Sequence, residues 1–104
     1  MAQKTIAGKN IQVNEEGYLL NPGEWDRDVA QALADEIGLG ALTDNHWKIL
    51  EYLRKCHRDG AALTLRKVGN AGIVDMKTLY QLFPGGPLKK SSLVAGIPKP
   101  VSCV

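Results

Sequence analysis

Alternating apolar and polar residues mark the first twenty positions of the chain. Ile6, Ile11 and Val13 are separated by polar side chains, and turn-forming residues occur at positions 8–10 and 16–17. Alternation with a period of two, interrupted by turns that contain glycine, is typical of short strands with one buried face. The pattern therefore predicts a small β-hairpin, or a three-stranded meander, over residues 1–20.

A helical period replaces this alternation after residue 20. In "NPGEW", Asn21 can cap a helix, Pro22 suits the first helical position and Glu24 lies where a capping box places its acid. Apolar residues then recur every four positions, at Trp25, Val29, Leu33 and Ile37. Because this stripe stops at Gly38, the sequence predicts one helix that begins at Pro22 and ends before the glycine.

The clearest helical pattern comes next. Thr43 is a capping residue, and apolar side chains recur at helical spacing until Asp59 and Gly60 end the pattern. The residues on this stripe are Trp47, Leu50, Leu53, Cys56 and His57. Charged residues occupy the other faces, so the sequence predicts an amphipathic helix.

Two shorter helices are predicted after it. "LTLRKVGNAG" indicates a helix that glycine ends, and "VDMKTLYQLF" indicates another that Asp75 caps. The residues expected on the inner side of the second are Met76, Leu79, Tyr80 and Phe83. Segments 64–69 and 75–83 together resemble a helix-turn-helix, whose Lys67 and Lys77 could face nucleic-acid phosphates. The alternative is that the two helices only pack against the body. A net charge of +2 and few polar side chains that could contact bases (Lys77, Gln81) favour nucleic-acid binding only weakly.

Glycine and proline organise the last twenty residues. "PGGP" at positions 84–87 ends the preceding helix, and "LKKSSLVAG" predicts one or two further helical turns. After Gly96, Pro98 and Pro100 exclude a helix and favour extended chain. We therefore predict a mainly α (α+β) single domain, with a hairpin over 1–20, a helical body over 21–96 and a mobile arm over 97–104.

Composition narrows the setting. The chain of 104 residues is 44% hydrophobic and 23% charged, which is typical of a globular protein. No apolar run approaches the roughly 20 residues of a membrane span, and no signal-peptide stretch is visible. We therefore expect a cytoplasmic protein without a membrane partner, where thiols stay reduced and a Cys56–Cys103 disulfide does not form. Two cysteines without CxxC spacing and two histidines predict no metal site.

The two cysteines have different surroundings. Cys56 lies on an apolar helical stripe, where an inert core thiol is expected. Cys103 is the penultimate residue and follows a proline-stiffened segment, so its thiol is expected to be accessible. The residues from Pro98 to Val104 can span roughly 20 Å at about 3.1 Å each. Cys103 is therefore the candidate catalytic residue, although an accidental cysteine on a frayed terminus is the alternative.

A reactive thiol at this position needs nearby positive charge. An unperturbed cysteine has a pKa near ~8.5, and the carboxylate of Val104 raises it because the two charges are alike. Candidate supporting cations are Lys99 on the arm, Lys89 before it and Arg66 on the segment 64–69. These residues can act on the thiol only if the arm lies close to them.

The end of the sequence resembles a known family. "LYQLFPGGPLKKSSLVAGIPKPVSC" resembles the C-terminal signature of the DsrC/TusE family of sulfur carriers, which includes sulfite reductase gamma subunits. "VNEEGYLLNPGEW", "LTDNHWKILEYLR" and "LTLRKVGNAG" extend the resemblance from about Ile11 to Val104. It implies a small helical fold with an N-terminal hairpin and a mobile arm whose penultimate cysteine carries sulfur as a transient persulfide, without a cofactor. Cys103 holds that position, and Arg66 and Lys89 match a recurring arginine and lysine of the family.

One departure from the family pattern concerns Ser92. DsrC proteins carry a second cysteine eleven residues before the last, where this chain has a serine. A single-cysteine arm resembles the TusE type, which implies a sulfurtransferase that relays sulfur from a TusBCD- or DsrEFH-type complex toward a tRNA thiolase, with tRNA contacted only indirectly. The alternative is a DsrC-like partner of dissimilatory sulfite reductase, which regains support if Ser92 replaces a natural cysteine. A noncatalytic subunit that docks its arm into such an enzyme is a further alternative.

Overall fold

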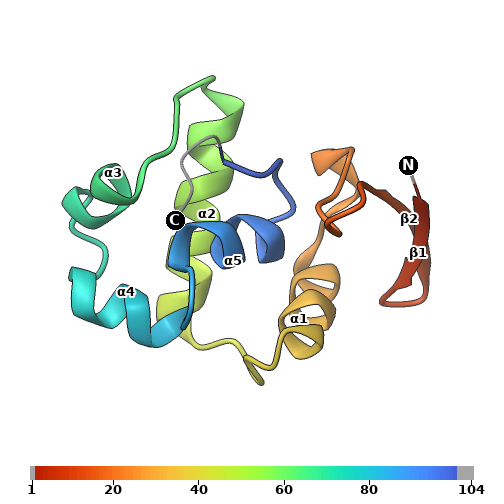
Figure 1. Cartoon of the computed structure of the whole chain (residues 1–104), viewed down its shortest axis with the longest axis horizontal. Helices are drawn as coiled ribbons and strands as arrows, with labels where there is room; N and C mark the ends of the chain where they lie inside the picture. The colour runs from red at the N-terminus through yellow and green to blue at the C-terminus, as the bar shows by residue number, and fades with distance from the viewer. Residues whose placement is uncertain (1, 101–104) are drawn as a thin grey trace.

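The computed structural model describes residues 2–100, which form a helical body with a short sheet at its N-terminal end (Figure 1). In chain order the elements are β1 (Ala2–Ile6), β2 (Lys9–Val13), the 3-10 turn η1 (Pro22–Glu24), α1 (Arg27–Glu36), α2 (Asp44–Arg58), α3 (Leu65–Asn70), α4 (Met76–Leu82) and α5 (Pro87–Val94). The predicted fold class, mainly α with a β start, is confirmed. Within residues 2–100, no helix has both the length and the apolar character that a bilayer-spanning segment needs.

The N-terminal hairpin forms as the alternation predicts. Strands β1 and β2 pair antiparallel, and the two residues between them, Ala7 and Gly8, have φ angles of 53° and 78°. Positive φ at both central residues matches the right-handed twist of a tight hairpin. The buried side chain of Ile6 turns toward the body. The third strand of a meander is reduced to one bridge between Val13 and Leu19.

The helix predicted from Pro22 begins instead at Arg27, so this prediction was wrong by five residues. Asn21 does act as a cap, but it caps only the three residues of η1. Trp25 follows with an extended backbone (φ −81°, ψ 142°), and Asp26 then caps α1. The chain therefore contains two caps in succession, and a short turn separates them.

Two contacts explain why α1 begins after Asp26, the second of the two capping residues. The carboxylate of Asp26 accepts a hydrogen bond from the backbone N–H of Val29 at 2.8 Å, which satisfies one free donor at the helix start. Its pKa is lowered, first by the hydrogen bond from Lys9 and then by the bond from Val29. The indole of Trp25 meanwhile donates to the carbonyl of Val94 at 2.8 Å, a contact that lies away from the α1 stripe.

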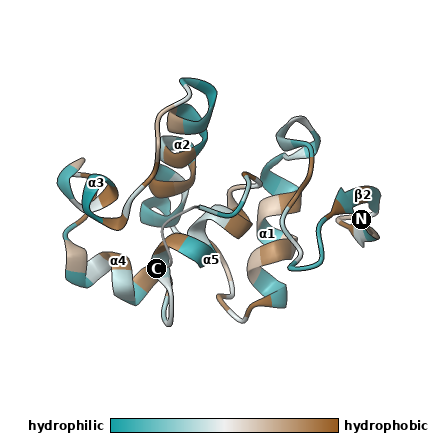
Figure 2. Ribbon diagram, turned by 45° about the horizontal axis from the view of Figure 1, so that its top comes forward, coloured by the Kyte–Doolittle hydropathy of each residue, from teal (hydrophilic) through white to brown (hydrophobic). Residues whose placement is uncertain are grey.

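Helix α2 matches its predicted bounds and supplies much of the core. Thr43 caps it, and the ring of His46 completes a capping box by accepting from the Thr43 N–H at 3.0 Å. Leu50 and Leu53 are fully buried, as the stripe predicts. Cys56 is 7% exposed, which agrees with an inert core thiol. The bands of brown and teal along α2 in Figure 2 show this division between an apolar and a polar side.

Helix α5 lies in the middle of the molecule, where α1, α2 and α4 contact it (Figure 1). Most of the residues of α5 are buried. The largest fully buried side chains of the core are Phe83, Ile6, Ile11, Leu19, Leu33, Ile49, Leu50, Leu53, Leu79, Leu88 and Ile97. Because α5 is the last helix, the segment that follows it begins at the centre of the body.

The short helices α3 and α4 form where capping residues predict them. The side chain of Thr64 accepts from the N–H of Lys67 at 3.0 Å, and Asp75 caps α4 in the same way. The inner side of α4 was predicted only in part, because Met76 and Tyr80 are 39% and 46% exposed. Leu79 and the C-cap residue Phe83 are buried, whereas Met76 and Tyr80, in the same helix of about two turns, lie at the edge of the core.

Candidate functional site

Cys103, the predicted catalytic residue, lies outside the described residues, so the site is approached through the segment that carries it. We call residues 94–100 the arm root. Cys103 follows Pro100 by three residues. The way in which the body holds the arm root therefore determines where the arm starts and in which direction it leaves.

The arm root begins with a firm helix end. Pro87 occupies the first turn of α5, and the helix ends at Val94 with Ala95 as its C-cap. Gly96 follows with a φ of 70°, which turns the chain out of the helix. Ile97 is 2% exposed and belongs to the core. The first residue of the predicted arm is thus anchored in the body, while the mobility of the arm beyond it stays a prediction.

Trp25 and Arg54 hold the carbonyl groups at the end of α5. The Trp25 indole N–H donates to the carbonyl of Val94 at 2.8 Å, and Arg54 Nη1 donates to that of Ala95 at 2.9 Å. Arg54 Nη2 also donates to the carbonyl of Pro22 at 3.1 Å, and its guanidinium lies 4.2 Å from the centre of the Trp25 ring. The last carbonyls of a helix have no partner within it, so these bonds replace the missing ones. We call this pair the Trp25–Arg54 clamp.

The clamp is partly withdrawn from solvent. Burial lowers the pKa of Arg54, and the nearby charge of Arg58 lowers it further. An arginine remains charged after such a change, because its ordinary pKa is above 12. The clamp therefore keeps a positive charge next to the negative end of the α5 dipole, which is a favourable arrangement.

The contact between Trp25 and Gly96 leaves no space for a side chain at position 96. A Cβ atom built on Gly96 would lie 2.4 Å from Cδ1 of Trp25 and 2.9 Å from its Cβ. Glycine is needed here for a second reason, because its φ is positive. The turn out of α5 therefore depends on an indole that packs directly against the backbone.

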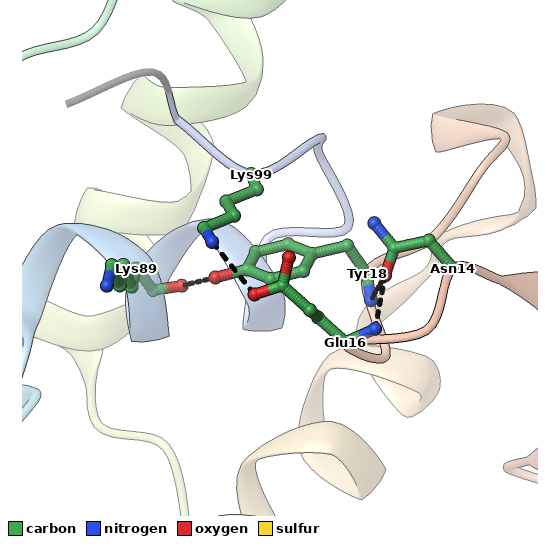
Figure 3. A network of polar contacts seen from close by, with 5 residues as sticks. All are labelled: Asn14, Glu16, Tyr18, Lys89 and Lys99. Atoms are coloured by element: carbon green, nitrogen blue, oxygen red, sulfur yellow. Dashed lines mark hydrogen bonds and ion pairs between the residues drawn. The ribbon is translucent and has the colours of Figure 1, made fainter. Parts of the chain in front are cut away.

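A second group of contacts lies beside the arm root (Figure 3). Lys99 forms an ion pair with Glu16 at 2.8 Å, and the hydroxyl of Tyr18 donates to the backbone carbonyl of Lys89 at 3.2 Å. The amide oxygen of Asn14 accepts from the N–H groups of Glu16 and Tyr18 at 2.9 and 3.0 Å, which shapes the loop between them. The N-terminal loop thus contacts both α5 and the arm root.

Tyr18 reports the electrostatics of this group. Its pKa is raised, first by burial and then by the carboxylate of Glu16, while the ammonium of Lys99 acts in the opposite direction. The structure thus brings Lys99 and the backbone of Lys89 to the same part of the molecule, where the contact of Lys89 is made by its carbonyl and not by its ammonium. The charge of Lys99 is balanced by Glu16, which the sequence analysis did not foresee.

Arg66, the third predicted cation, lies on another side of the molecule. It is exposed on α3, and Figure 1 shows α3 on the far side of α2 from the hairpin and η1. The loop that carries Glu16 lies near the hairpin, so Arg66 does not join the group around Lys99. Cys103 lies outside the described residues, so the support of its thiol by Arg66 stays a prediction.

A groove of about 230 Å³ runs along the arm root. Its lining residues are His57, Ala61, Ala62, Leu63 and the residues 97–100. His57 is exposed here while Cys56 is buried, so the prediction that both lie on the apolar stripe of α2 was wrong for His57. Within residues 2–100, no group of three histidine, cysteine or acidic side chains gathers that could hold a metal ion.

Ser92 lies inside α5 and is fully buried. Its hydroxyl has no hydrogen-bond partner within residues 2–100, whereas the neighbouring Ser91 donates to the carbonyl of Pro87 at 2.5 Å. A buried hydroxyl without a partner costs about 1–3 kcal/mol, and a thiol of similar size is better tolerated in an apolar place. The surroundings of position 92 therefore suit a small apolar or sulfur-containing side chain better than a hydroxyl.

Comparisons with known proteins agree on one family. The family model described as DsrC-like protein matches residues 5–104. The chain is 32% identical to the "Sulfite reductase, dissimilatory-type subunit gamma" of Nitratidesulfovibrio vulgaris, with both chains fully covered. It is 31% identical to "Sulfurtransferase TusE" of Pectobacterium atrosepticum, over 93% of this chain and 95% of that protein.

Solved structures extend the agreement to the fold. The solution structure of Allochromatium vinosum DsrC superposes with a TM-score of 0.82 at 36% identity, over 98% of this chain and 97% of that one. A crystal structure described as dissimilatory sulfite reductase I (DsrI) gives a TM-score of 0.86 at 32% identity, over 99% and 100%. The similarity therefore covers the hairpin, the helical body and the order of the elements.

Proposed function

Because the chain belongs to the DsrC-like family, we propose that it is a sulfur carrier that accepts persulfide sulfur on Cys103 and passes it to a partner protein. The names of its relatives, a sulfurtransferase and a sulfite reductase subunit, support sulfur relay in general. The observation that carries the proposal for this chain is a penultimate cysteine that follows an arm root held by the body from several sides.

The chemistry is thiol–persulfide exchange. The Cys103 thiolate attacks the terminal sulfur of a donor persulfide, R–S–SH, and the donor sulfur–sulfur bond breaks as a new one forms on Cys103. The donor leaves as the thiolate R–S⁻, so the step needs no net oxidant, reductant or cofactor. Delivery repeats the exchange with an acceptor thiolate, and Cys103 is then the leaving group. As in disulfide exchange, the rate follows the fraction of thiolate and its access.

Part of the positive charge that activates the Cys103 thiol is expected to come from the partner protein. An unperturbed cysteine has a pKa near ~8.5, so most of the Cys103 thiol is protonated at neutral pH unless positive charge lies nearby. The nearest described cation along the chain is Lys99, and Glu16 balances its charge. We therefore expect the donor or acceptor to present its own cations at the thiol, so that Cys103 becomes most reactive inside a complex.

We propose transfer toward a tRNA thiolase as the specific role, with a TusBCD-type complex as the donor. The single cysteine of the arm favours this role, because Ser92 cannot form a disulfide or trisulfide with Cys103. The alternative is a DsrC-like partner of dissimilatory sulfite reductase, supplied by a DsrEFH-type complex. The similarity to the gamma subunit, 32% against 31% for the TusE protein, favours neither role.

Intact-mass measurement tests the sulfur site. After incubation with a small-molecule persulfide, the wild-type chain should gain about 32 Da, one sulfur atom in the exchange, and lose it on reduction. Cys103→Ser should abolish the gain, whereas Cys56→Ser, the matched control at the buried cysteine, should keep it. A gain that persists in Cys103→Ser would refute the site.

Transfer of labelled sulfur tests the specific role. Cys103 loaded with ³⁵S-persulfide should pass label to a tRNA thiolase and onward to tRNA, and should pass little to a dissimilatory sulfite reductase. The reverse preference would replace the proposed role with the alternative. Alkylation of Cys103 separates transfer from docking, because binding through the arm backbone can survive alkylation while sulfur delivery cannot.

A further inference from the structure

We propose that Trp25 and Arg54 are positioning residues for sulfur transfer, because they fix the direction in which the arm leaves the body. The inference rests on the proposed role of Cys103, and it concerns residues that do not touch the reacting sulfur. It assigns a function to a contact between η1, α2 and the end of α5.

The first support is that the clamp acts on the last rigid point before the arm. Helix ends fray, because their final carbonyls lack partners within the helix. Here two such carbonyls, of Val94 and Ala95, receive donors from Trp25 and Arg54 at 2.8 and 2.9 Å. The donors come from two separate elements, so the helix end cannot move without breaking contacts to both.

The second support is the choice of residue at position 54. A partly buried charge loses hydration, and an apolar residue of similar volume often provides as much stability. Arg54 instead uses its two donors to join the carbonyl of Ala95 to that of Pro22 at 3.1 Å, on the segment before α1. A planar fork that reaches two carbonyls at set positions holds geometry, which a hydrophobic side chain could not do.

The third support is the short path from the clamp to the thiol. Gly96 packs against Trp25, Ile97 is buried, and Pro98 and Pro100 restrict the backbone between them. Few freely rotating residues therefore separate the clamp from Cys103. The effective concentration of a tethered group at a partner site depends on the length and stiffness of its tether, so a stiff tether with a fixed starting point limits the positions that its end can reach.

The molecule contains a matched control for the clamp. Arg27 lies over the ring of Trp47 at 4.1 Å, close to the 4.2 Å of Arg54 over Trp25. The control pair joins the start of α1 to α2 and donates to no carbonyl of α5 in the described chain. Equal substitutions in the two pairs remove similar chemistry, but only one of them loosens the arm root.

The test measures two reactions of Cys103 in the full chain. One is sulfur uptake from a persulfide-loaded TusBCD-type complex, and the other is alkylation by iodoacetamide, which needs no orientation. Trp25→Phe and Arg54→Lys should slow uptake by about 10- to 100-fold, because small misplacements of a reacting group cost rates of this order. Alkylation should stay at the wild-type rate. Trp47→Phe and Arg27→Lys should change neither reaction.

A spectroscopic readout tests the geometry without any partner. Nitroxide labels on Cys103 and on a Glu51→Cys variant, in a Cys56→Ala background, report the distribution of distances between arm and body. Trp25→Phe and Arg54→Lys should broaden this distribution, while Arg27→Lys should leave it unchanged. Arg54→Lys keeps the charge and most of the volume, so it retains the fold while losing the fork.

The outcomes separate this inference from the proposed function. Wild-type protein that takes no sulfur on Cys103 refutes the sulfur-carrier role, and the distance distributions still decide whether the clamp directs the arm. Folded clamp variants with wild-type uptake, or with unbroadened distances, overturn the positioning role. Equal losses in the Arg27–Trp47 controls overturn it as well, because the effect would then be general instability.

Discussion

The arm root and the α3–α4 pair are built in different ways. In α3 and α4, each N-cap bond joins residues three positions apart, from Thr64 to Lys67 and from Asp75 to Thr78. At the arm root, the bonds join Trp25 to Val94 and Lys99 to Glu16, which are 69 and 83 positions apart. Contacts between neighbouring residues therefore explain the start of α3 and of α4, whereas the contacts of the arm root form only when distant segments pack together. The region that must hold a direction is the one tied to distant segments.

Two glycine substitutions test this comparison, and one of them has the largest expected effect on stability. Gly96→Ala should destabilise the protein by about 3 kcal/mol or more, because it combines a positive φ with a methyl group that collides with Trp25. Gly72→Ala, between α3 and α4, should cost only about 1–2 kcal/mol, since its φ is 78° but nothing lies within 4 Å of the new Cβ. Urea unfolding of both variants measures the difference. Equal losses would show that the close contact with Trp25 contributes nothing.

The two tryptophans provide the next effect in size. Trp25→Phe should cost about 1–2 kcal/mol, because the carbonyl of Val94 loses its donor in a partly buried place. Trp47→Phe removes a similar volume and weakens the stacking with Arg27, without unpairing a carbonyl of α5. It should therefore cost less. Thermal unfolding with both variants at one pH tests this order, and a larger loss for Trp47→Phe would contradict it.

In the region built from local contacts, removal of the N-cap of α3 should have a smaller effect on stability. Thr64→Ala removes the acceptor for the N–H of Lys67 and should destabilise the protein by about 1 kcal/mol. Thr64→Ser keeps the hydroxyl and should retain wild-type stability, so it serves as the control. Hydrogen exchange should show faster opening of α3 in Thr64→Ala, with the amides of α5 unaffected. Equal acceleration at α5 would mean that the two regions are coupled.

The smallest effect concerns the ion pair of Lys99 with Glu16. Its side chains are 38% and 56% exposed, so Glu16→Gln should cost less than about 1 kcal/mol. Because the Glu16 carboxylate contributes to the raised pKa of Tyr18, the variant should lower that pKa toward 10.0. Ultraviolet titration of the tyrosinate, with Tyr18→Phe to assign the signal, measures the change. An unchanged titration would show that burial alone sets the pKa.

The raised pKa of Tyr18 also makes the stability of the protein depend on pH. A raised folded-state pKa means that the fold favours the neutral hydroxyl of Tyr18, which donates to the carbonyl of Lys89. This contribution is complete below pH 10, the ordinary pKa, and is lost as pH rises through the folded-state pKa. Unfolding free energy should therefore fall above pH 10, and less steeply in Tyr18→Phe. A parallel fall in both proteins would exclude Tyr18 as its source.

The α2 stripe and the hairpin show how much local pattern can determine. Thr43 and Asp59 bound α2 as predicted, and the alternation of Ile6, Ile11 and Val13 yields the paired strands. Capping residues, glycine turns and periodicity act over a few neighbouring residues, so they can be recognised in the amino-acid sequence alone. The assignment to a sulfur-carrier family also came from the sequence, through the ending that contains Cys103.

Tertiary structure decided what surrounds the arm. It moved Trp25 out of the predicted first helix and paired Lys99 with Glu16. It also revealed Arg54, because a side chain that donates to distant backbone carbonyls leaves no period or motif in a sequence. Caps and stripes follow from the chemistry of adjacent residues. The position of the arm root follows from contacts that exist only after segments far apart in the chain have packed together.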